Sequence, residues 1–350
     1  MQCVNAGVLR GDVAAMLAAA GMDTEKSEVV ADVLVEADMI GHRTHGVGLV
    51  PWYLEALASG ELVGRGDHTV VADRGSCITW NGNGLPGPWL VTRALDLASQ
   101  RAAQYGVVTV AISRSHHTGA LAAYLRKVTE RGLVVQISCS TPSQTRVAPF
   151  GGTVAMLTPN PQGFGFPTGG DPILIDMSSS ITATTHTRQL AEKGERFPEA
   201  WALTAKGEPS DDPQEVTSRG GTLMPLGGAL KGHKGFSLAL AIEAMGQGLS
   251  GHGRVDRPKG IVLSVFIQVI DPNAFVGHDG FIRQVSYLAN ACRSNPPAPG
   301  VQSVKVPGDN AARARRVALS EGVPLDDTFQ TRLRAKAAEL GIEWTGTQEE

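Results

Sequence analysis

The sequence predicts an α/β fold with a small helical unit at its N-terminus. Residues 9–21 and 24–40 carry apolar side chains at helical spacing, whereas short runs rich in β-branched residues begin near residue 69. Within 107–140, a strand pattern, a polar loop, a helix pattern and a second strand pattern follow one another. Glycine is frequent, at 42 of 350 residues, and falls in loops without a period. This distribution favours close backbone approaches, such as those around a bulky ligand.

Bulk properties exclude several classes of protein. The net charge of −3 and the pI of about 6.3 show no bias towards nucleic acid or an anionic membrane. No apolar run reaches membrane-spanning length, and no charged segment followed by an apolar one marks a signal peptide. The four cysteines are far apart and form no CxxC pair, so we expect reduced thiols, a cytoplasmic protein and no zinc site.

The helical unit leads into the stretch 41–53, GHRTHGVGLVPWY, where we place the chemistry. Residues 51–59 predict a short helix that Gly60 closes. Imidazole exchanges a proton near neutral pH, so His45 is a candidate acid or base. Gly46 beside it has no side chain and therefore lets a ligand approach closely. A partly buried histidine without a role is the alternative that this stretch alone leaves open.

The next region has strand patterns at 69–72 and 77–80, and then the hexapeptide GNGLPG at 82–87. This hexapeptide has the form of the G-x-G-x-x-G fingerprint of dinucleotide-binding loops. One proline lies inside it and another follows it, and no acidic residue stands about 20 positions further on, where the fingerprint requires one. We therefore predict a turn before a helix over 89–105 instead of a Rossmann phosphate loop.

A buried strand pattern at 107–112 ends in the polar loop SRSHHTG, which carries His116 and His117. A helix pattern over 120–131 and a strand pattern over 133–140 follow and complete a βαβ-like unit. Ligands of α/β sheets bind at strand ends, so the histidine pair is a second candidate for the site. An exposed polar loop is the alternative, and no metal site is expected because further ligands at suitable spacing are missing.

Residues 141–180 are rich in turn formers and contain strand patterns at 164–167 and 173–177. Asp176 stands at the end of the second pattern and is followed by three serines, a combination that suits hydrogen bonds to a sugar or a phosphate. A solvated loop fits the same composition. Residues 181–219 are polar and predict an irregular excursion.

The sequence KGHKG at 231–235 precedes a helix pattern over 236–245. It brings a lysine, free amides and the positive end of a helix dipole together, which makes it a candidate anion site without P-loop spacing. A strand pattern over 260–270 follows. The C-terminal part then predicts helices over 281–292, 311–319 and 327–340, with a turn at 308–310.

Seven short segments match one pattern in order along nearly the whole chain. They are Gly41 with Thr44-His45-Gly46-Val47, Pro51 and Tyr53; His117 with Gly119; Ala148-Pro149-Phe150-Gly151-Gly152 with Asn160-Pro161; Pro172-Ile173 and Asp176-Met177 with Ser178-Ser179-Ser180; Trp201-Ala202-Leu203 with Gly207-Glu208-Pro209 and Asp212-Pro213; Gly232-His233-Lys234-Gly235; and Val306-Pro307-Gly308-Asp309. In these segments the chain resembles the type 2 malate/L-lactate dehydrogenase family, also called L-sulfolactate dehydrogenase-like. That family includes ureidoglycolate dehydrogenase, 2,3-diketo-L-gulonate reductase and Δ1-piperideine-2-carboxylate reductase.

The resemblance implies a non-Rossmann dinucleotide-binding α/β domain with a mixed sheet, and a homodimer with its active site near the subunit interface. It implies a helical domain over residues 1–68, the α/β domain over 69–303 and a C-terminal helical segment over 304–350 that packs on the first domain. It also implies cofactor contacts from Thr141, Ser143, Asp176, Met177, Ser178, Ser180, His233, Lys234, Gly308, Asp309 and Asn310.

The activity that the resemblance implies is hydride transfer between NAD or NADP and a 2-hydroxy acid or 2-oxo acid. His45 is the first choice for the proton shuttle, with His117 as its partner or alternate. Arg43, Thr44 and Trp52 are expected to contact the substrate. A cyclic-imine reductase is the nearest alternative activity, and a non-catalytic nucleotide-binding protein is the alternative from another class.

Two departures from the family pattern bear on the substrate. Thr44 stands where serine is usual, which keeps a hydroxyl. Many members carry arginine at the position of Leu49 or of Trp52, and this chain has neither. A bulkier or differently charged substrate would account for this, and Trp52 favours a ring-bearing one. The other arginines that we consider for a substrate carboxylate are Arg43, Arg146 and Arg188.

Overall fold

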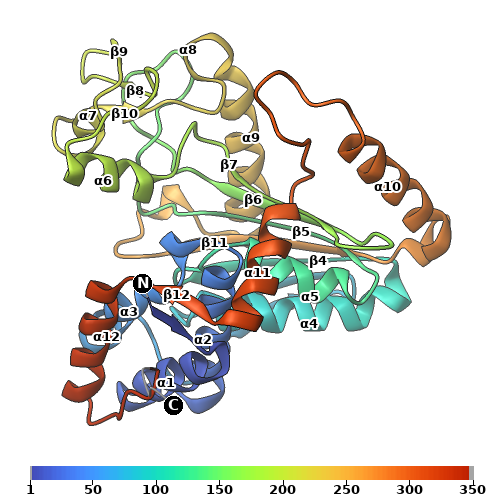
Figure 1. The fold of residues 1–350 in the computed structure, drawn as a ribbon, viewed down its shortest axis with the longest axis horizontal. Helices are drawn as coiled ribbons and strands as arrows, with labels where there is room; N and C mark the ends of the chain where they lie inside the picture. The colour runs from blue at the N-terminus through green and yellow to red at the C-terminus, as the bar shows by residue number, and fades with distance from the viewer. Residues whose placement is uncertain (1, 347–350) are drawn as a thin grey trace.

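The computed structural model describes residues 2–346, and a seven-stranded mixed sheet lies at its centre (Figure 1). The strands are ordered β2-β3-β4-β11-β5-β6-β7. β3 and β4 pair in parallel, and the other neighbouring pairs are antiparallel. The bounds are β2 Thr69–Asp73, β3 Cys77–Asn81, β4 Val107–Ser115, β5 Val134–Ser140, β6 Pro161–Phe166, β7 Ile173–Ser178 and β11 Leu263–Ile270.

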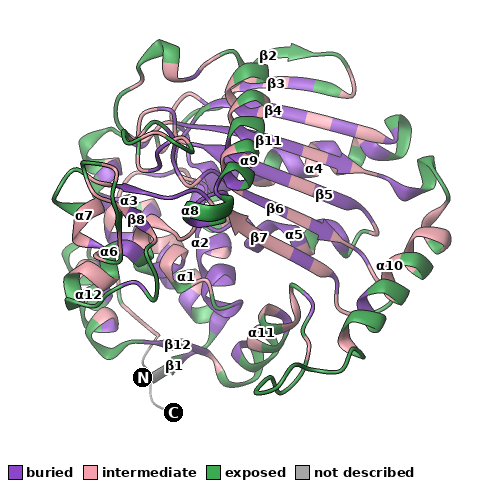
Figure 2. Cartoon of the chain, turned by 90° about the horizontal axis from the view of Figure 1, so that it is seen from above, coloured by how far each residue is buried: buried purple, intermediate pink, exposed green. Residues whose placement is uncertain are grey.

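Helices cover both faces of this sheet and complete a three-layer structure (Figures 1 and 2). α4 (Gly87–Tyr105) and α5 (Ala122–Thr129) pack on one face. α9 (His233–Glu243) and the π-helical turn Ala244–Gly248 pack on the other. Strand β11 is therefore covered on both sides, which explains its nearly unbroken run of apolar residues.

The predicted βαβ-like unit is present as β4, α5 and β5, but its two strands are not neighbours. β11 lies between them and runs antiparallel to both. The parallel pair of the sheet is instead formed by β3 and β4, which are neighbours and are joined by the helix α4. The turn predicted at GNGLPG is confirmed, because α4 begins at Gly87 and the preceding Asn83 and Gly84 have positive φ.

The N-terminal helices share a second hydrophobic core with the C-terminal end of the chain. α1 (Ala6–Ala19), α2 (Thr24–Met39) and α3 (Val50–Ser59) pack with α12 (Asp327–Glu339) around buried apolar side chains. α11 (Asp309–Glu321) packs against α2.

A small two-stranded sheet ties the two ends of the chain to each other. β1 (Gln2–Val4) pairs antiparallel with β12 (Val323–Leu325), and Figure 2 shows the two at the lower edge of the molecule. α10 (His278–Arg293), by contrast, lies at the periphery of the sheet domain, and among its residues only Ala289 is buried.

The prediction of an irregular excursion over residues 181–219 was wrong in part, because this region contains the ten-residue helix α6 (Thr184–Lys193). Thr187 is the single buried residue of α6, so the helix has no apolar stripe for a periodicity argument to detect. A small sheet ordered β10-β8-β9 accompanies it. The remaining bounds here are β8 Ala202–Leu203, β9 Pro209–Ser210, α7 Gln214–Thr217, β10 Thr222–Leu223 and α8 Gly228–Lys231.

Within residues 2–346, no helix has both the length and the apolar character needed to cross a membrane. The same residues contain no group of three or more His, Cys, Asp or Glu side chains placed to hold a metal ion.

Candidate active site

One end of the central sheet gathers the segments that the sequence singled out. The C-terminal ends of β4, β5 and β7 all lie there, as the register of the strands between them shows. His116 and His117 leave β4 at this end, and the loop after Ser140 leaves β5 beside them. The serine run 178–180 leaves β7 at the same end.

The helical unit presents His45 to this sheet end on two short 3-10 turns between α2 and α3, Arg43–His45 and Val47–Leu49. Asp38 on α2 anchors these turns, because its Oδ2 accepts the N–H of Val47 at 2.7 Å. A Cβ atom at Gly46 would lie only 2.1 Å from the Asp38 carboxylate, so a side chain there would push the turn away.

Burial raises the pKa of the Asp38 carboxyl to about 7, against the opposing effects of the Val47 N–H and of Arg43. Asp38 is 7% exposed. Asp38 was not singled out from the sequence, since an acidic residue inside a helix pattern gives no signal of such a contact.

The two candidate histidines meet across this interface. The rings of His45 and His117 are stacked, with centroids 5.7 Å apart and planes 11° from parallel. Thr44 Oγ1 lies 2.9 Å from Nδ1 of His45. With the Thr44 hydroxyl accepting from Nδ1–H, Nε2 of His45 is left to exchange a proton with a substrate.

His117 is held more rigidly than His45. Its Nδ1 accepts the N–H of Gly119 at 3.2 Å, which places the proton of the neutral ring on Nε2. The Tyr53 hydroxyl donates to the carbonyl oxygen of His117 at 3.1 Å. Burial, with smaller effects from His45 and His116, lowers the pKa of His117 to about 3.

The pKa of His45 is lowered chiefly by burial, and the nearby Asp176 carboxylate opposes this effect. Asp176 also accepts the N–H of Ala122 at 2.8 Å and lies 4.0 Å from Nδ1 of His42. The structure therefore brings the predicted residues His45, His117 and Asp176 together, from three different segments of the chain.

Trp52, which we expect from the sequence to contact the substrate, packs against His116 and His117. The Trp52 ring stacks on His116, with centroids 5.1 Å apart, and meets His117 edge-on at 5.4 Å. His116 is fully buried, and within the described chain neither of its ring nitrogens has a hydrogen-bond partner. This burial lowers the pKa of His116 to about 4.

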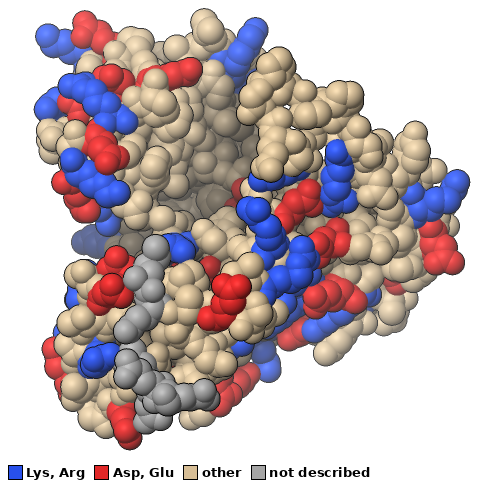
Figure 3. Space-filling model, viewed as in Figure 1, with Lys and Arg blue, Asp and Glu red and all other residues tan. Residues whose placement is uncertain are grey.

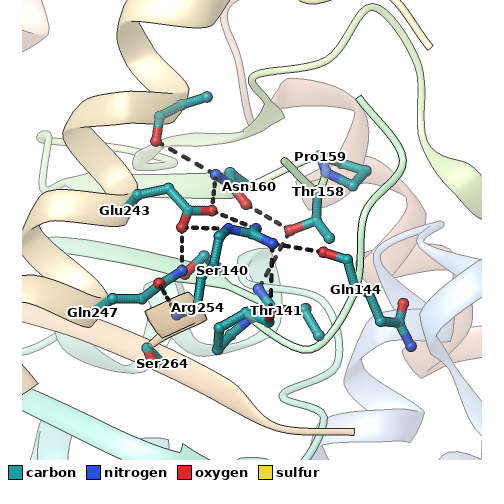
Figure 4. Close-up of polar contacts among 12 residues, drawn as sticks. Ser140, Thr141, Gln144, Thr158, Pro159, Asn160, Glu243, Gln247, Arg254 and Ser264 are labelled. Carbon is teal, nitrogen blue, oxygen red and sulfur yellow. Dashed lines mark hydrogen bonds and ion pairs between the residues drawn. The ribbon is translucent and has the colours of Figure 1, made fainter. Parts of the chain in front are cut away.

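The ion pair of Arg254 and Glu243 fixes the predicted cofactor loop after β5 (Figure 4). Arg254 donates to both carboxylate oxygens of Glu243, at 2.7 and 2.9 Å, and to the carbonyl of Gln144 at 2.7 Å. Thr158 Oγ1 accepts the N–H of Thr141 at 3.3 Å. The loop is thereby fixed through its backbone, and Ser143 remains half-buried at its turn.

The serine run and the KGHKG segment lie against each other. Leu226 donates its N–H to the carbonyl of Ser179 at 2.8 Å, and a Cβ at Gly235 would lie 2.6 Å from that same carbonyl. The serine hydroxyls are already engaged, since Ser178 donates to the Ser180 carbonyl and Ser180 donates to that of Thr182. Nearby, Met177 is half-buried, whereas His233 and Lys234 are exposed.

The last predicted cofactor segment, Gly308 to Asn310, lies beside the start of β7. Leu174 donates its N–H to the Pro307 carbonyl at 3.0 Å. The Asp309 carboxylate is paired with Arg293 at 2.7 Å, and this hydrogen bond lowers the pKa of Asp309. Asp309 thus has a structural partner of its own.

Arg146 and Arg188, considered from the sequence as substrate cations, line a cavity beside α6 and α7, whereas Arg43 lies in the same 3-10 turn as His45. A deep hollow separates the α6 to α9 lobe from the helical unit (Figure 3). Asp176 and Lys234 lie on segments that the structure brings to this sheet end, and a carboxylate and a lysine are side-chain types that suit the ribose and the phosphates of a nicotinamide dinucleotide.

Comparisons with known proteins identify the family of this chain. A family model described as Malate/L-lactate dehydrogenase matches residues 4–334. The chain is 32% identical to the L-lactate dehydrogenase of Cupriavidus necator, with 93% of this chain and 95% of the relative covered. It is also 32% identical to the (2R)-3-sulfolactate dehydrogenase (NADP(+)) of Chromohalobacter salexigens, covering 92% and 94%. The crystal structure of Δ1-piperideine-2-carboxylate reductase from Pseudomonas syringae matches with a TM-score of 0.85 at 26% identity, covering 96% and 100%.

Proposed function

This chain belongs to the malate/L-lactate dehydrogenase family, and we propose that His45 moves the proton of its reaction. The protein is an NAD(P)-dependent oxidoreductase that interconverts a 2-hydroxy acid and a 2-oxo acid. The observation that carries the proposal is the stacked pair of His45 and His117, which lies beside Asp176 at the sheet end.

When bound, the nicotinamide dinucleotide supplies the hydride to C2 of the 2-oxo acid or accepts it from the 2-hydroxy acid. The protein must then give a proton to the substrate oxygen or remove one. Nε2 of His45 performs this transfer, while Thr44 holds Nδ1. His117 is half-buried with its Nδ1 bonded to the N–H of Gly119, and a ring whose pKa is about 3 is hardly protonated near neutral pH and is therefore a poor proton donor.

The substrate carboxylate needs a positive partner, because Leu49 and Trp52 supply none. We assign this role to Arg43, which is exposed in the turn that carries His45. Trp52 contacts His116 and His117, which follow β4, and forms an apolar wall, which favours a substrate with a bulky or ring-shaped side chain.

The position of Trp52 also supports a second candidate activity, reduction of a cyclic imine with a carboxylate at C2. His45 would then orient or protonate the C=N group. A panel of 2-oxo acids and cyclic imines, each tested with NADH and NADPH, separates the two activities. Faster reduction of an imine than of any 2-oxo acid would select the imine. Cofactor binding without oxidation on the whole panel would instead favour a non-catalytic nucleotide-binding protein.

The proposal for His45 is tested by His45→Gln, with His117→Gln as the matched comparison. A positioned acid or base contributes about 10²–10⁴-fold, so His45→Gln is expected to lower kcat by at least about two orders of magnitude. Cofactor affinity, followed by NAD(P)H fluorescence, should change little. Normal turnover in His45→Gln together with loss in His117→Gln would transfer the role to His117.

We also propose a homodimer in the cytoplasm. Large apolar side chains that a partner could cover stand exposed in the second half of the chain, including Leu230 at 86%, Val255 at 90% and Tyr287 at 74%. Sedimentation equilibrium measures the assembly state directly. The cytoplasmic assignment is supported by four free cysteines, Cys3, Cys77, Cys139 and Cys292.

A further inference from the structure

A cavity of about 660 Å³ lies in the lobe beside the active site, between α6, α7 and the chain that follows the loop after β5. Its wall includes two arginines, Arg146 and Arg188, and the hydroxyl residues Thr184, Thr217 and Ser218. The volume is far larger than a single small ion needs and lies within the range of ligand pockets, roughly 300–1,000 Å³.

Both arginines are available to an anion. Among the ion pairs of residues 2–346, neither Arg146 nor Arg188 has a carboxylate within 4.0 Å. Arg146 donates one hydrogen bond to the neighbouring Thr145 carbonyl, and Glu192 lines the cavity without pairing with Arg188. Two guanidinium groups against one carboxylate leave the cavity wall with a net positive charge.

The cavity continues two segments that we assign to the cofactor. Arg146 comes three residues after Ser143, and Thr184 comes four residues after Ser180. Both continuations are bonded to one short stretch of chain, since Leu223 donates its N–H to the Arg146 carbonyl at 2.9 Å and Ile181 donates to the Met224 carbonyl at 3.0 Å. A ligand that follows both segments away from the histidine pair is therefore directed towards the cavity.

We propose that this cavity binds the 2′-phosphate of NADP, with Arg146 and Arg188 as its partners, so that the protein prefers NADP to NAD. The inference rests on the proposed function, which places the dinucleotide along these two segments. Guanidinium groups recognise phosphate monoesters by paired, charge-assisted hydrogen bonds, and the 2′-phosphate is the phosphate monoester that distinguishes NADP from NAD.

Binding of nucleotide fragments tests the cavity without any catalysis. Isothermal calorimetry on the full-length protein compares 2′,5′-ADP, which has the extra phosphate, with 5′-AMP and with inorganic phosphate. We expect 2′,5′-ADP to bind about tenfold or more tightly than 5′-AMP, and the double variant Arg146→Gln/Arg188→Gln to abolish this difference. The control is Arg196→Gln in the same lobe, because Arg196 is already paired with Asp211 and should leave the difference intact.

Steady-state kinetics supply the second arm. The double variant should raise KM for NADPH about tenfold or more while KM for NADH and kcat stay near their original values. Equal affinity for 2′,5′-ADP and 5′-AMP, or binding of inorganic phosphate as tight as that of 2′,5′-ADP, would overturn the inference. Oxidation of NADH in that case would leave the proposed function standing. Selective binding of 2′,5′-ADP that is lost in the double variant, with neither cofactor oxidised, would support the cavity and refute the proposed function.

Discussion

His45 and His117 differ in their surroundings more than in their position. Burial lowers the pKa of both rings. At His45 the Asp176 carboxylate opposes this effect and outweighs the smaller lowering by His42, whereas at His117 the neighbouring histidines lower the pKa further and no carboxylate of residues 2–346 opposes them. Reduction needs a protonated shuttle. Because the pKa of His45 lies below its ordinary value, the reductive kcat/KM is expected to fall with rising pH already below about pH 6.5.

Thr44 should set the position of this pH limb. Thr44→Val removes the oxygen that accepts from Nδ1–H of the imidazolium, so it should lower the pKa of His45 further and move the limb to lower pH. We expect kcat at neutral pH to fall about tenfold. Thr44→Ser keeps the hydroxyl and should restore both values. An unchanged pH profile in Thr44→Val would show that the contact does not tune His45.

Asp38 should make folding stability depend on pH. Its folded pKa of about 7 exceeds the unfolded value of 3.8, so the folded protein binds more protons between these two values. The contribution is fully present below about pH 4 and is lost as pH rises to about 7. Urea unfolding of Asp38→Asn should therefore show a smaller loss of stability between pH 5 and pH 8 than the original chain shows.

Asp96→Asn is the control for this prediction, since Asp96 is exposed and paired with Arg131 on the surface. It should leave the pH dependence unchanged. An Asp38→Asn variant with the original slope would mean that another group is responsible.

At the scale of elements, the start of α4 packs against the backbone of His116 and His117. A Cβ at Gly87 would lie 2.4 Å from the carbonyl oxygen of His117 and 2.6 Å from that of His116. Gly87→Ala should therefore displace the end of β4 and lower kcat about tenfold or more, because small misplacements of reacting groups are costly. Cofactor affinity should change much less.

Gly11→Ala in α1 is the matched control for this substitution. A Cβ there meets no atom within 4 Å, and alanine favours a helix interior by roughly 0.5–1 kcal/mol. This variant should keep full activity and unfold at a slightly higher temperature. Equal activity of the two glycine variants would contradict the supporting role of Gly87.

The sequence was sufficient for elements with strong periodicity and for residues with distinctive chemistry. The strands β4, β5 and β11 follow from apolar runs, and His45 and His117 follow from imidazole chemistry beside glycine. The placement of β11 between β4 and β5 could not be predicted, because strand pairing depends on contacts between distant parts of the chain. The helix α6 was missed because it buries only Thr187.

For the site, local patterns gave the histidines but not their partners. In the sequence, Asp38 cannot be distinguished from an acidic residue on the solvent-facing side of a helix. Its contact with the N–H of Val47 forms because the 3-10 turns fold back onto α2. Likewise, the pairing of Asp309 with Arg293 joins residues 16 positions apart in the sequence, which no local pattern indicates.

At the scale of the whole molecule, both chain ends contribute to the unit that carries His45. α12 packs against α3, and α3 bears Trp52 and Tyr53. Leu333 on α12 is fully buried in the core shared with the N-terminal helices. The C-terminal helix therefore supports one wall of the active site, although its residues are far from His45 and His117 along the chain.

Leu333→Ala should remove part of this shared core and destabilise the protein by about 2–5 kcal/mol, the usual cost of truncating a buried leucine. Arg332→Ala, at the exposed neighbouring position, is the control and should stay within about 0.5 kcal/mol. In urea, activity and the tryptophan fluorescence of the chain should be lost together and at lower denaturant concentration in Leu333→Ala. If activity survived after the helical unit had unfolded, the dependence of the site on the C-terminal helix would be disproved, because His45 cannot face the sheet end without α3 in place.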